Sequence, residues 1–252
     1  MTLPVIGLPC CRWWLKDSQF FHLVGEKYLR AATWAGGAPI PSLPALGEEA
    51  PLAQWLDMVD GLLFTGSPSN IEPHHYGEAR RRRFQTTPSA TPPRRCWCAP
   101  RWTPYAAAGH LSRPARNQRG FGRQPARPSA YALPGMRDHR EKATRWTRNM
   151  AWPHPLTLAE GGCVAPGAGR HPRRKRNSRM ARASGTLGAG LRAEAWAPDG
   201  LIEAFSVAEA KSFAVAVQWH PEWRIDAHPL SRALFTAFGD ACRQRRAARL
   251  AA

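Results

Sequence analysis

Near the end of the chain, a histidine and a glutamate have the residue types and the spacing of an acid–base pair. His220 and Glu222 lie in the segment Gln-Trp-His-Pro-Glu-Trp at 218–223, which follows an apolar run at 213–217. Because Pro221 favours an extended backbone at the residue before it, we expect the two side chains to point to the same side. A carboxylate beside an imidazole orients the ring and stabilises its protonated form, so such a pair can serve a cysteine nucleophile. The alternative, a surface His-x-Glu without a role, is disfavoured by the apolar run that precedes it.

The cysteines of the chain supply no obvious nucleophile for this pair. A reactive thiol needs a lowered pKa in a fixed electropositive environment, and the sequence gives none of them such surroundings. Those near the two ends are expected to pack as small apolar residues, and a single Cys-x-Cys at 96–98 is too little for a zinc site. We therefore expect reduced thiols, no metal, no cofactor and no identifiable nucleophile. The six cysteines are Cys10, Cys11, Cys96, Cys98, Cys163 and Cys242.

The net charge of +18 is concentrated in one part of the chain. Residues 79–185 contain 24 Lys and Arg against 3 Asp and Glu, whereas the rest of the chain contains 12 against 15. A strongly basic chain would ordinarily suggest a nucleic-acid partner. Because the two ends are ordinary in charge, a partner that recognises the basicity would have to bind this one segment.

The residues before the basic segment predict alternating strands and helices. An apolar run at 4–8 predicts a buried strand, and a helix is expected from near Asp17, with Phe20 and Phe21 on its apolar face, to the glycines at 36–37. Strand–helix alternation is typical of a parallel sheet covered by helices on both faces. The further elements expected in this part are an extended piece at 38–40, a helix at 52–59 and a strand at 60–66.

The residues after the basic segment predict a hairpin, a strand and a helix. Two alternating runs within 191–207 flank a Pro-Asp-Gly at 198–200, which is good turn chemistry. The apolar run at 213–217 predicts a buried strand, so the acid–base pair should lie at its carboxyl end. Apolar residues at helical spacing follow from near His228.

The middle of the chain has no sustained helical or strand period. Residues 79–134, 142–152 and 163–185 are dominated by Arg, Pro, Ala and Gly. A loop this long without structure is improbable inside a compact domain, and a disordered basic insertion is the simplest interpretation. We expect a single domain over 1–252 with a scrambled segment at 79–185 inside it.

Several stretches of the two ends resemble one known family. They resemble the γ-glutamyl hydrolase branch of the class I glutamine-amidotransferase-like proteins, most of all the γ-glutamyl-γ-aminobutyrate hydrolases of putrescine degradation. The resemblance implies a flavodoxin-like, doubly wound, mostly parallel α/β sheet, with a disrupted or disordered central region in this chain. The matching stretches are Pro-Val-Ile-Gly at 4–7, Glu-Lys-Tyr-Leu at 26–29, Ala-Gly-Gly-Ala-Pro-Ile at 35–40, Gly-Ser-Pro-Ser-Asn at 66–70, His-His-Tyr-Gly-Glu at 74–78, Asp-His-Arg at 138–140, Ala-Pro-Asp-Gly-Leu-Ile-Glu-Ala at 197–204 and the segment at 218–223.

The resemblance also implies an activity and a set of roles. The activity is cysteine-dependent hydrolysis of γ-glutamyl amide bonds, with His220 as the base and Glu222 as the group that orients it. Gly66 corresponds to an oxyanion-hole glycine, with a plain turn glycine as the weaker alternative. Ser67 and Asn70 correspond to residues that line the glutamyl pocket, although turn capping explains these two equally well. The partner would be a small molecule. Because no apolar run reaches the roughly 20 residues of a membrane span, and the N-terminus lacks the features of a signal peptide, a cytoplasmic location is expected.

The nucleophile motif of the family, Ile-Cys-Arg-Gly, is absent from the chain as written. Plausible GC-rich codons for 109–113, read one base later, give Ala-Ile-Cys-Arg-Gly. Comparable shifts over 94–105, 117–125 and 180–184 give other family-like stretches in family order. We therefore predict that the middle is a patchwork of shifted reading frames, that the nucleophile lies out of frame under 110–113, and that the chain as written is catalytically impaired.

Two other interpretations remain open from the sequence. The chain could be a basic nucleic-acid-binding protein on a degenerate hydrolase frame, its Arg-rich segment contacting phosphates and its aromatic residues stacking on bases. Off-frame translation of GC-rich DNA produces the same composition, which makes this alternative the weaker one. The chain could also fail to fold, because losing central strands leaves sheet edges exposed.

Overall fold

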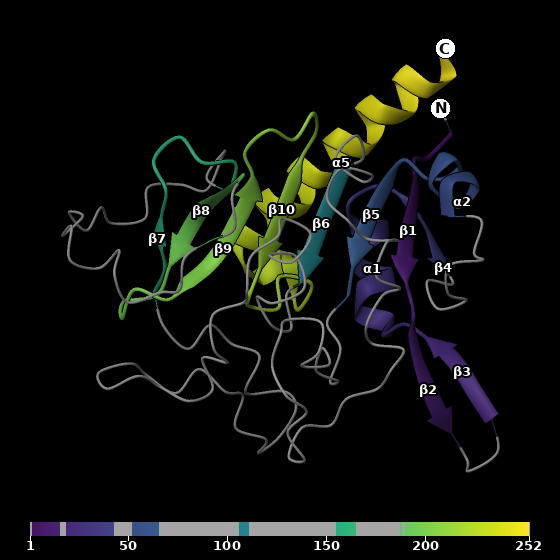
Figure 1. The fold of residues 1–252 in the computed structure, drawn as a ribbon, viewed down its shortest axis with the longest axis horizontal. Coiled ribbons are helices and arrows are strands. Elements are labelled where there is room, and N and C mark those ends of the chain that lie inside the picture. Colours follow the sequence, from purple (N-terminus) through teal and green to yellow (C-terminus); the bar gives the residue numbers. More distant parts are fainter. Residues whose placement is uncertain are drawn as a thin grey trace.

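The computed structural model describes residues 2–15, 19–42, 52–65, 106–110, 155–164, 187 and 190–251. Over these residues the chain forms an eight-stranded sheet in the order β4-β1-β5-β6-β10-β9-β8-β7, with a separate two-stranded ribbon, β2-β3 (Figure 1). The strands are β1 (Val5–Pro9), β2 (Cys11–Leu15), β3 (Gln19–Leu23), β4 (Ala38–Ser42), β5 (Gly61–Phe64), β6 (Ala106–His110), β7 (Thr157–Leu158), β8 (Leu191–Trp196), β9 (Ile202–Val207) and β10 (Ala214–Val217). The helices are α1 (Glu26–Trp34), α2 (Leu52–Met58), the 3₁₀ turn η5 (Ile225–Ala227) and α5 (Pro229–Leu250).

The sheet is parallel through its centre and antiparallel at one side. Strands β4, β1, β5, β6 and β10 run in the same direction, and β9, β8 and β7 continue the sheet antiparallel to their neighbours. The mostly parallel sheet expected from the sequence is thus confirmed. The parallel strands have their carboxyl ends at the lower edge in Figure 1, which is where open α/β sheets place their sites.

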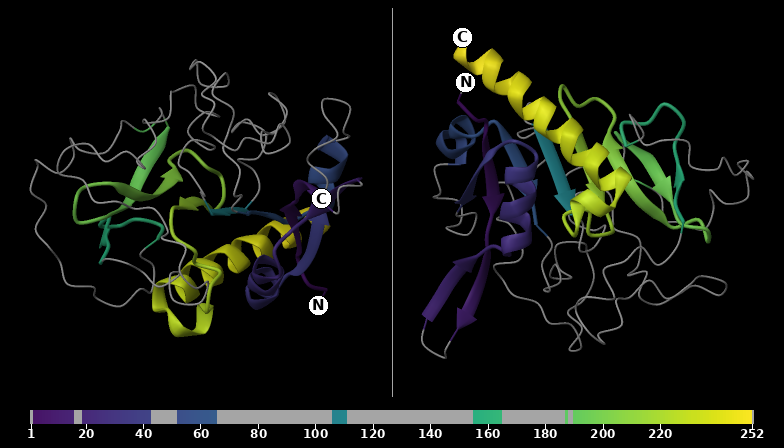
Figure 2. Two further views of the ribbon diagram at one scale, coloured as in Figure 1. Left: turned by 90° about the horizontal axis from the view of Figure 1, so that it is seen from below. Right: turned by 180° about the vertical axis from the view of Figure 1, so that it is seen from behind.

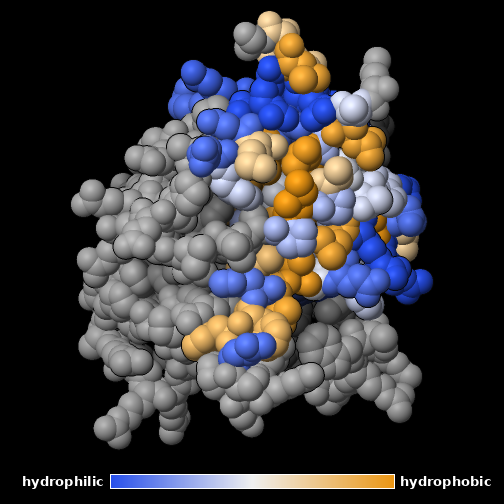
Figure 3. Space-filling view, turned by 90° about the vertical axis from the view of Figure 1, so that its right-hand side faces the viewer, coloured by the Kyte–Doolittle hydropathy of each residue, from blue (hydrophilic) through white to orange (hydrophobic). Residues whose placement is uncertain are grey.

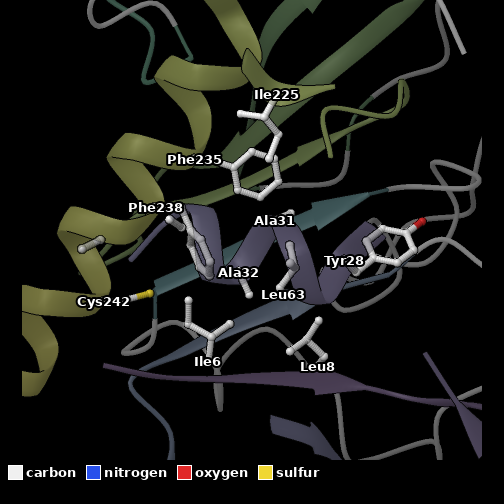
Figure 4. Packing of buried hydrophobic residues seen from close by; sticks show 12 residues of the cluster. Ile6, Leu8, Tyr28, Ala31, Ala32, Leu63, Ile225, Phe235, Phe238 and Cys242 are labelled. Carbon is white, nitrogen blue, oxygen red and sulfur yellow. The ribbon is translucent and has the colours of Figure 1, made fainter. Parts of the chain in front are cut away.

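Helices cover both faces of the parallel strands, as in a doubly wound fold. On one face, Ile6 and Leu8 of β1 and Leu63 of β5 pack against α1 and α5, the latter through Phe235 and Phe238 (Figure 4). On the other face, the alternate residue Leu62 packs with Leu56 and Val59, in and just after α2. The left view of Figure 2 shows α2 on the side of the sheet opposite α1 and α5. Because successive side chains of a strand point to opposite faces, each of these strands contributes to two apolar layers, one on either side of the sheet.

The expected helix from Asp17 is wrong in its first part. Residues 19–23 form β3, which pairs antiparallel with β2, and α1 begins only at Glu26. Phe20 and Phe21 lie opposite Trp14 and Trp13 in this ribbon. Aromatic residues stabilise cross-strand pairs as readily as a helix face, so their positions in the sequence could not distinguish the two.

Strand β6 lies inside the stretch 79–134, where no regular element was expected. Its sequence, Ala-Ala-Ala-Gly-His, is too short and too uniform to show an alternating pattern. It pairs with β5 on one side and β10 on the other. The backbone hydrogen bonds to these two neighbours hold it in the sheet.

The elements at the C-terminal side match the sequence expectations. Gly200 takes φ +87 in the turn between β8 and β9, and the backbone N–H of Leu201 donates to Asp199 Oδ1 at 3.3 Å. Helix α5 begins at Pro229, as expected, and extends to Leu250. Among the described residues, no helix is both long enough and apolar enough to cross a membrane.

Prolines mark the free edge of the sheet at β4. This strand pairs only with β1 in the described sheet, and it has the sequence Ala-Pro-Ile-Pro-Ser. Pro39 and Pro41 lack the N–H that a further strand would need, which is how edges resist unwanted pairing. Ile40 between them is exposed. Seen from this side of the molecule, hydrophobic residues form a band flanked by hydrophilic ones (Figure 3).

Candidate active site

The segment that carries His220 and Glu222 leaves the sheet at the carboxyl end of β10. Its start is fixed by Gln218, whose backbone N–H donates to Glu203 O at 2.8 Å and whose side-chain Nε2 donates to Ile202 O at 3.1 Å. The backbone then turns, because the N–H of Trp223 donates to the carbonyl of His220 at 3.3 Å. The extended backbone expected through Glu222 is therefore wrong, and Pro221 occupies the second position of a turn, where its fixed φ is favourable.

The turn nevertheless brings the two side chains together as expected. Glu222 Oε1 lies 2.7 Å from His220 Nδ1. The carboxyl side chain is 1 % exposed and the imidazole side chain 17 %. With Glu222 accepting a hydrogen bond from Nδ1–H, the other ring nitrogen, Nε2, is left to exchange a proton with a substrate or nucleophile.

A lysine that the sequence analysis assigned no role completes the cluster. Lys27 Nζ lies 2.7 Å from Glu222 Oε1 and 3.2 Å from His220 Nδ1. It belongs to the first turn of α1 and its side chain is 24 % exposed. The available signal was its place in the family-like stretch Glu-Lys-Tyr-Leu at 26–29. Its partners are far away in the sequence, so no local pattern could assign it to them.

Contacts between α1 and the turn after Glu222 fix the cluster in space. The indole N–H of Trp34, at the end of α1, donates to Asp226 Oδ1 at 2.8 Å. Ile225 is buried in the same apolar cluster as α1 and α5. Arg224, just before it, takes φ +49, a left-handed conformation that a non-glycine residue adopts only when its surroundings impose it. The segment 220–226 is thus held at both ends against the helix that supplies Lys27.

The other residues predicted for the site lie outside the described residues. These are Gly66, Ser67 and Asn70. Strand β5 ends at Phe64, and Thr65 after it is buried with its hydroxyl 3.5 Å from the carbonyl of Pro9. The chain therefore enters the segment of Gly66 from the carboxyl end of β5.

Strand β6 ends between the two strands that lead to these predicted residues. Its Gly109 is in register with Phe64 of β5, and its His110 is in register with Val217 of β10. The chain therefore leaves β6 with the start of the Gly66 segment on one side and the His220 segment on the other. Residues 111–113, under which the nucleophile codon is predicted to lie, are outside the described residues.

Two of the described cysteines, Cys163 and Cys242, have environments unlike that of a nucleophile. Cys10, Cys11, Cys163 and Cys242 are all free thiols. Burial raises the pKa of Cys242 to about 12, and the carboxylate of Asp60 adds to the rise. Burial and the charge of Glu194 raise the pKa of Cys163 to about 11. Thiols with such pKa values carry little thiolate at neutral pH, and the expectation that Cys242 packs against the core is confirmed.

Metal-binding clusters are absent from the described ranges: no three side chains of His, Cys, Asp or Glu gather there as ligands would. The arrangement at the carboxyl edge is instead that of proton transfer. A buried carboxylate holds an imidazole next to the end of a central strand, the geometry used to activate a nucleophile and to protonate a leaving group.

Comparisons with known proteins identify relatives along most of the chain. The sequence model of one family, Peptidase C26, matches residues 4–96 and 128–222. The γ-glutamyl-γ-aminobutyrate hydrolase PuuD of Escherichia coli strain K12 is 34 % identical over 262 residues, covering 96 % of this chain and 94 % of the relative. The γ-glutamyl-γ-aminobutyrate hydrolase of Shigella flexneri is 33 % identical over 258 residues, covering 94 % and 93 %. A solved structure of a protein described as a GMP synthase subunit, from Thermoplasma acidophilum, covers 99 % of both chains with a TM-score of 0.49 at 10 % identity.

The family match extends beyond the stretches in which the sequence analysis found clear similarity. It includes 79–96 and all of 128–185, where that similarity was limited to isolated stretches. It leaves out 97–127, the part of the chain that contains β6 and the predicted out-of-frame nucleophile.

Proposed function

The chain belongs to the peptidase C26 family, and on that premise we propose that it hydrolyses γ-glutamyl amide bonds, with γ-glutamyl-γ-aminobutyrate as its substrate. The proposal is carried by the hydrogen-bonded His220–Glu222 pair at the carboxyl end of β10, 2.7 Å apart with the carboxylate buried. It is supported by relatives that bear the name of this hydrolase and align over nearly the whole chain.

The proposed reaction proceeds through an acyl-enzyme. A cysteine thiolate attacks the γ-carbonyl, after its proton has passed to Nε2 of His220. The imidazolium then gives this proton to the departing amine, so that the amide C–N bond breaks while the C–S bond remains. Water, deprotonated by the same ring, attacks the thioester and releases glutamate. Throughout, Glu222 holds the ring by Nδ1 and offsets its positive charge.

Three further residues are assigned to the γ-glutamyl group in this proposal. The backbone N–H of Gly66 would hold the oxyanion that forms when the carbonyl is attacked. Ser67 and Asn70 would bind the glutamyl end of the substrate. The support is their position in the chain, directly after the strand next to β6.

For the nucleophile, we propose that its codon lies out of frame under 110–113. Two observations support this. Strand β6 ends at His110, between the ends of β5 and β10. The family match is interrupted at 97–127, around the same point. The active form would then be a chain in which the frame is corrected within codons 97–127, where the family match is interrupted, and Ala-Ile-Cys-Arg-Gly replaces residues 109–113; we call it the frame-restored chain.

The test compares both chains, made from two genes, by the release of glutamate from γ-glutamyl-γ-aminobutyrate. The frame-restored chain should be at least about 10³-fold faster than the chain as written, because a missing nucleophile leaves only residual catalysis. Replacing its restored cysteine by alanine is the matched control and should abolish the difference. Comparable rates for both chains would overturn the frame proposal. No hydrolysis by either folded chain would overturn the proposed function.

We also propose that the enzyme works in the cytoplasm on a diffusible small molecule. Its free cysteines, including half-buried Cys11, are at home in a reducing compartment. Cell fractionation with markers for each compartment checks this, and recovery in an extracellular or membrane fraction would contradict it.

A further inference from the structure

Lys27 brings an amino group to the carboxylate that orients the histidine. Its Nζ and His220 Nδ1 both reach the same oxygen, Glu222 Oε1, at 2.7 Å. The nitrogens of these two groups are themselves 3.2 Å apart. The carboxylate oxygen is therefore shared between an ammonium group and an imidazole.

This sharing resolves a problem that a buried carboxylate creates. Glu222 is 1 % exposed, and an ionised carboxylate removed from water requires a compensating charge. In an isolated His–Glu pair, the carboxylate is compensated only when the ring is protonated, so the ring tends to keep its proton. With Lys27 present, the carboxylate is compensated when the ring is neutral. A protonated ring then lies next to a second positive charge, which disfavours the protonated form.

We infer that Lys27 is a positioning residue that holds Glu222 ionised and keeps His220 in its neutral, proton-accepting form. The inference rests on the proposed function, because a neutral ring matters only if it takes a proton from a nucleophile. The consequence for the reaction is that the base is available at neutral pH and returns its proton readily to the leaving amine. Lys27 reaches the reacting atoms only through its two neighbours.

Other charged groups near the cluster are engaged elsewhere. Glu26, beside Lys27 in the first turn of α1, is held by Arg30 at 2.6 Å. Asp226, in η5, accepts from Trp34. The N-terminal end of α1 adds a partial positive charge of the same sign as Lys27. Among the described residues, these groups leave the direction of the Lys27 effect unchanged.

The experiment is a titration of the His220 ring by NMR in the folded chain, without substrate. The ring signal is assigned by its loss in His220→Asn. In Lys27→Met, which keeps the length of the side chain and removes its charge, the midpoint of the ring titration should move up by about 1 pH unit. Lys27→Arg restores the charge and should return the midpoint to within about 0.3 unit of the original.

Arg30→Met provides the matched control, since it removes the same charge from an exposed residue one turn along α1. It should leave the midpoint unchanged. If Lys27→Met prevents folding, Lys27→Gln is measured in its place, with thermal unfolding as the check. A midpoint that stays the same in the neutral variants, or moves down, overturns the inference. The titration requires no turnover, so its outcome is independent of whether the chain hydrolyses a γ-glutamyl amide.

Discussion

Two carboxylates are buried near opposite ends of the parallel strands, one before a strand and one after a strand, and the groups they pair with differ in kind. Asp60 directly precedes β5 and is fully buried, whereas Glu222 follows the end of β10. Asp60 accepts hydrogen bonds from the backbone N–H of Val5 at 2.8 Å, from Arg249 Nε at 3.0 Å and from Arg246 Nη1 at 3.3 Å. Glu222 shares one oxygen between His220 and Lys27.

Under the proposed function, the difference separates a structural charge, Asp60, from a functional one, Glu222. Guanidinium groups do not lose their protons in proteins, so the partners of Asp60 are the same at every ordinary pH. They connect α5 to the beginning of β5 and β1. The imidazole next to Glu222 gains and loses a proton, and a lysine competes for the same oxygen. Burial alone therefore does not mark a catalytic carboxylate; a partner whose charge can change does.

The largest effect on activity should come from replacing His220, the partner of Glu222 whose charge can change. His220→Asn in the frame-restored chain should lower kcat/KM for γ-glutamyl-γ-aminobutyrate by about 10³-fold or more, because neither proton transfer has another carrier. Thermal unfolding should change little. Asp60→Asn is the counterpart, and it should keep its activity per folded molecule. An equal loss of activity in His220→Asn and Asp60→Asn would contradict the distinction between a catalytic and a structural site.

Asp60→Ala should have the largest effect on stability. Two guanidinium groups and the Val5 N–H lose their acceptor, so the free energy of unfolding should fall by about 3 kcal/mol in urea titrations. Asp60→Asn keeps an acceptor for Val5 and should lose less. A change below about 0.5 kcal/mol in Asp60→Ala, the range of an ordinary surface substitution, would show that the network contributes little.

The burial of Cys242, on α5 near Asp60, should also be visible in the pH dependence of stability. The pKa of Cys242 is raised from 9.0 to about 12 in the folded chain, by burial first and Asp60 second. Between these two values the unfolded chain binds fewer protons, so stability falls as pH rises; below pH 9 this contribution is fully present. By pH 10.5 the loss should be about 2 kcal/mol.

Cys242→Ala is the comparison for this prediction. It has a lower stability at neutral pH because it leaves a small cavity, but it should lack this part of the alkaline slope. Denaturant titrations of both chains at pH 8 and 10.5 give the two slopes. Equal slopes would mean that Cys242 is not the group that titrates.

The smallest effect is expected for an exposed carboxylate of the same helix that supplies Lys27. Glu26 pairs with Arg30 at the i,i+4 spacing, and both side chains are largely exposed. Glu26→Gln should change the free energy of unfolding by about 0.3–0.5 kcal/mol, and less at high salt. A loss comparable to that of Asp60→Ala would contradict the view that burial sets the strength of these ion pairs.

Elements with strong local signals were predictable from the sequence. The hairpin of β8 and β9 has its own turn chemistry, β10 is a continuous apolar run, and α5 has a clear period with a proline at its start. The proximity of His220 to Glu222 was predictable for a related reason, since residues this close in sequence have few ways to be placed.

The features that were missed depend on partners distant in sequence. Strand β3 lies where the sequence predicted the start of a helix, because its aromatic residues suit either structure. Strand β6 consists of small residues and owes its place to β5 and β10. Lys27 gains its role only when α1 is packed beside the end of β10. In each case tertiary contacts, rather than local pattern, determine the outcome.

Strand β6 also has a consequence for how the chain folds. In the described sheet it is the connection between β4-β1-β5 and β10-β9-β8-β7. Its pairs, Gly61 with Ala106 and His110 with Val217, each close a long stretch of chain. Contacts of this kind carry a high loop-closure entropy and slow the folding of parallel sheets. Together with α5, which packs against strands of both halves, the five residues of β6 therefore bear on whether the two halves of the sheet fold and unfold as one cooperative unit or as two.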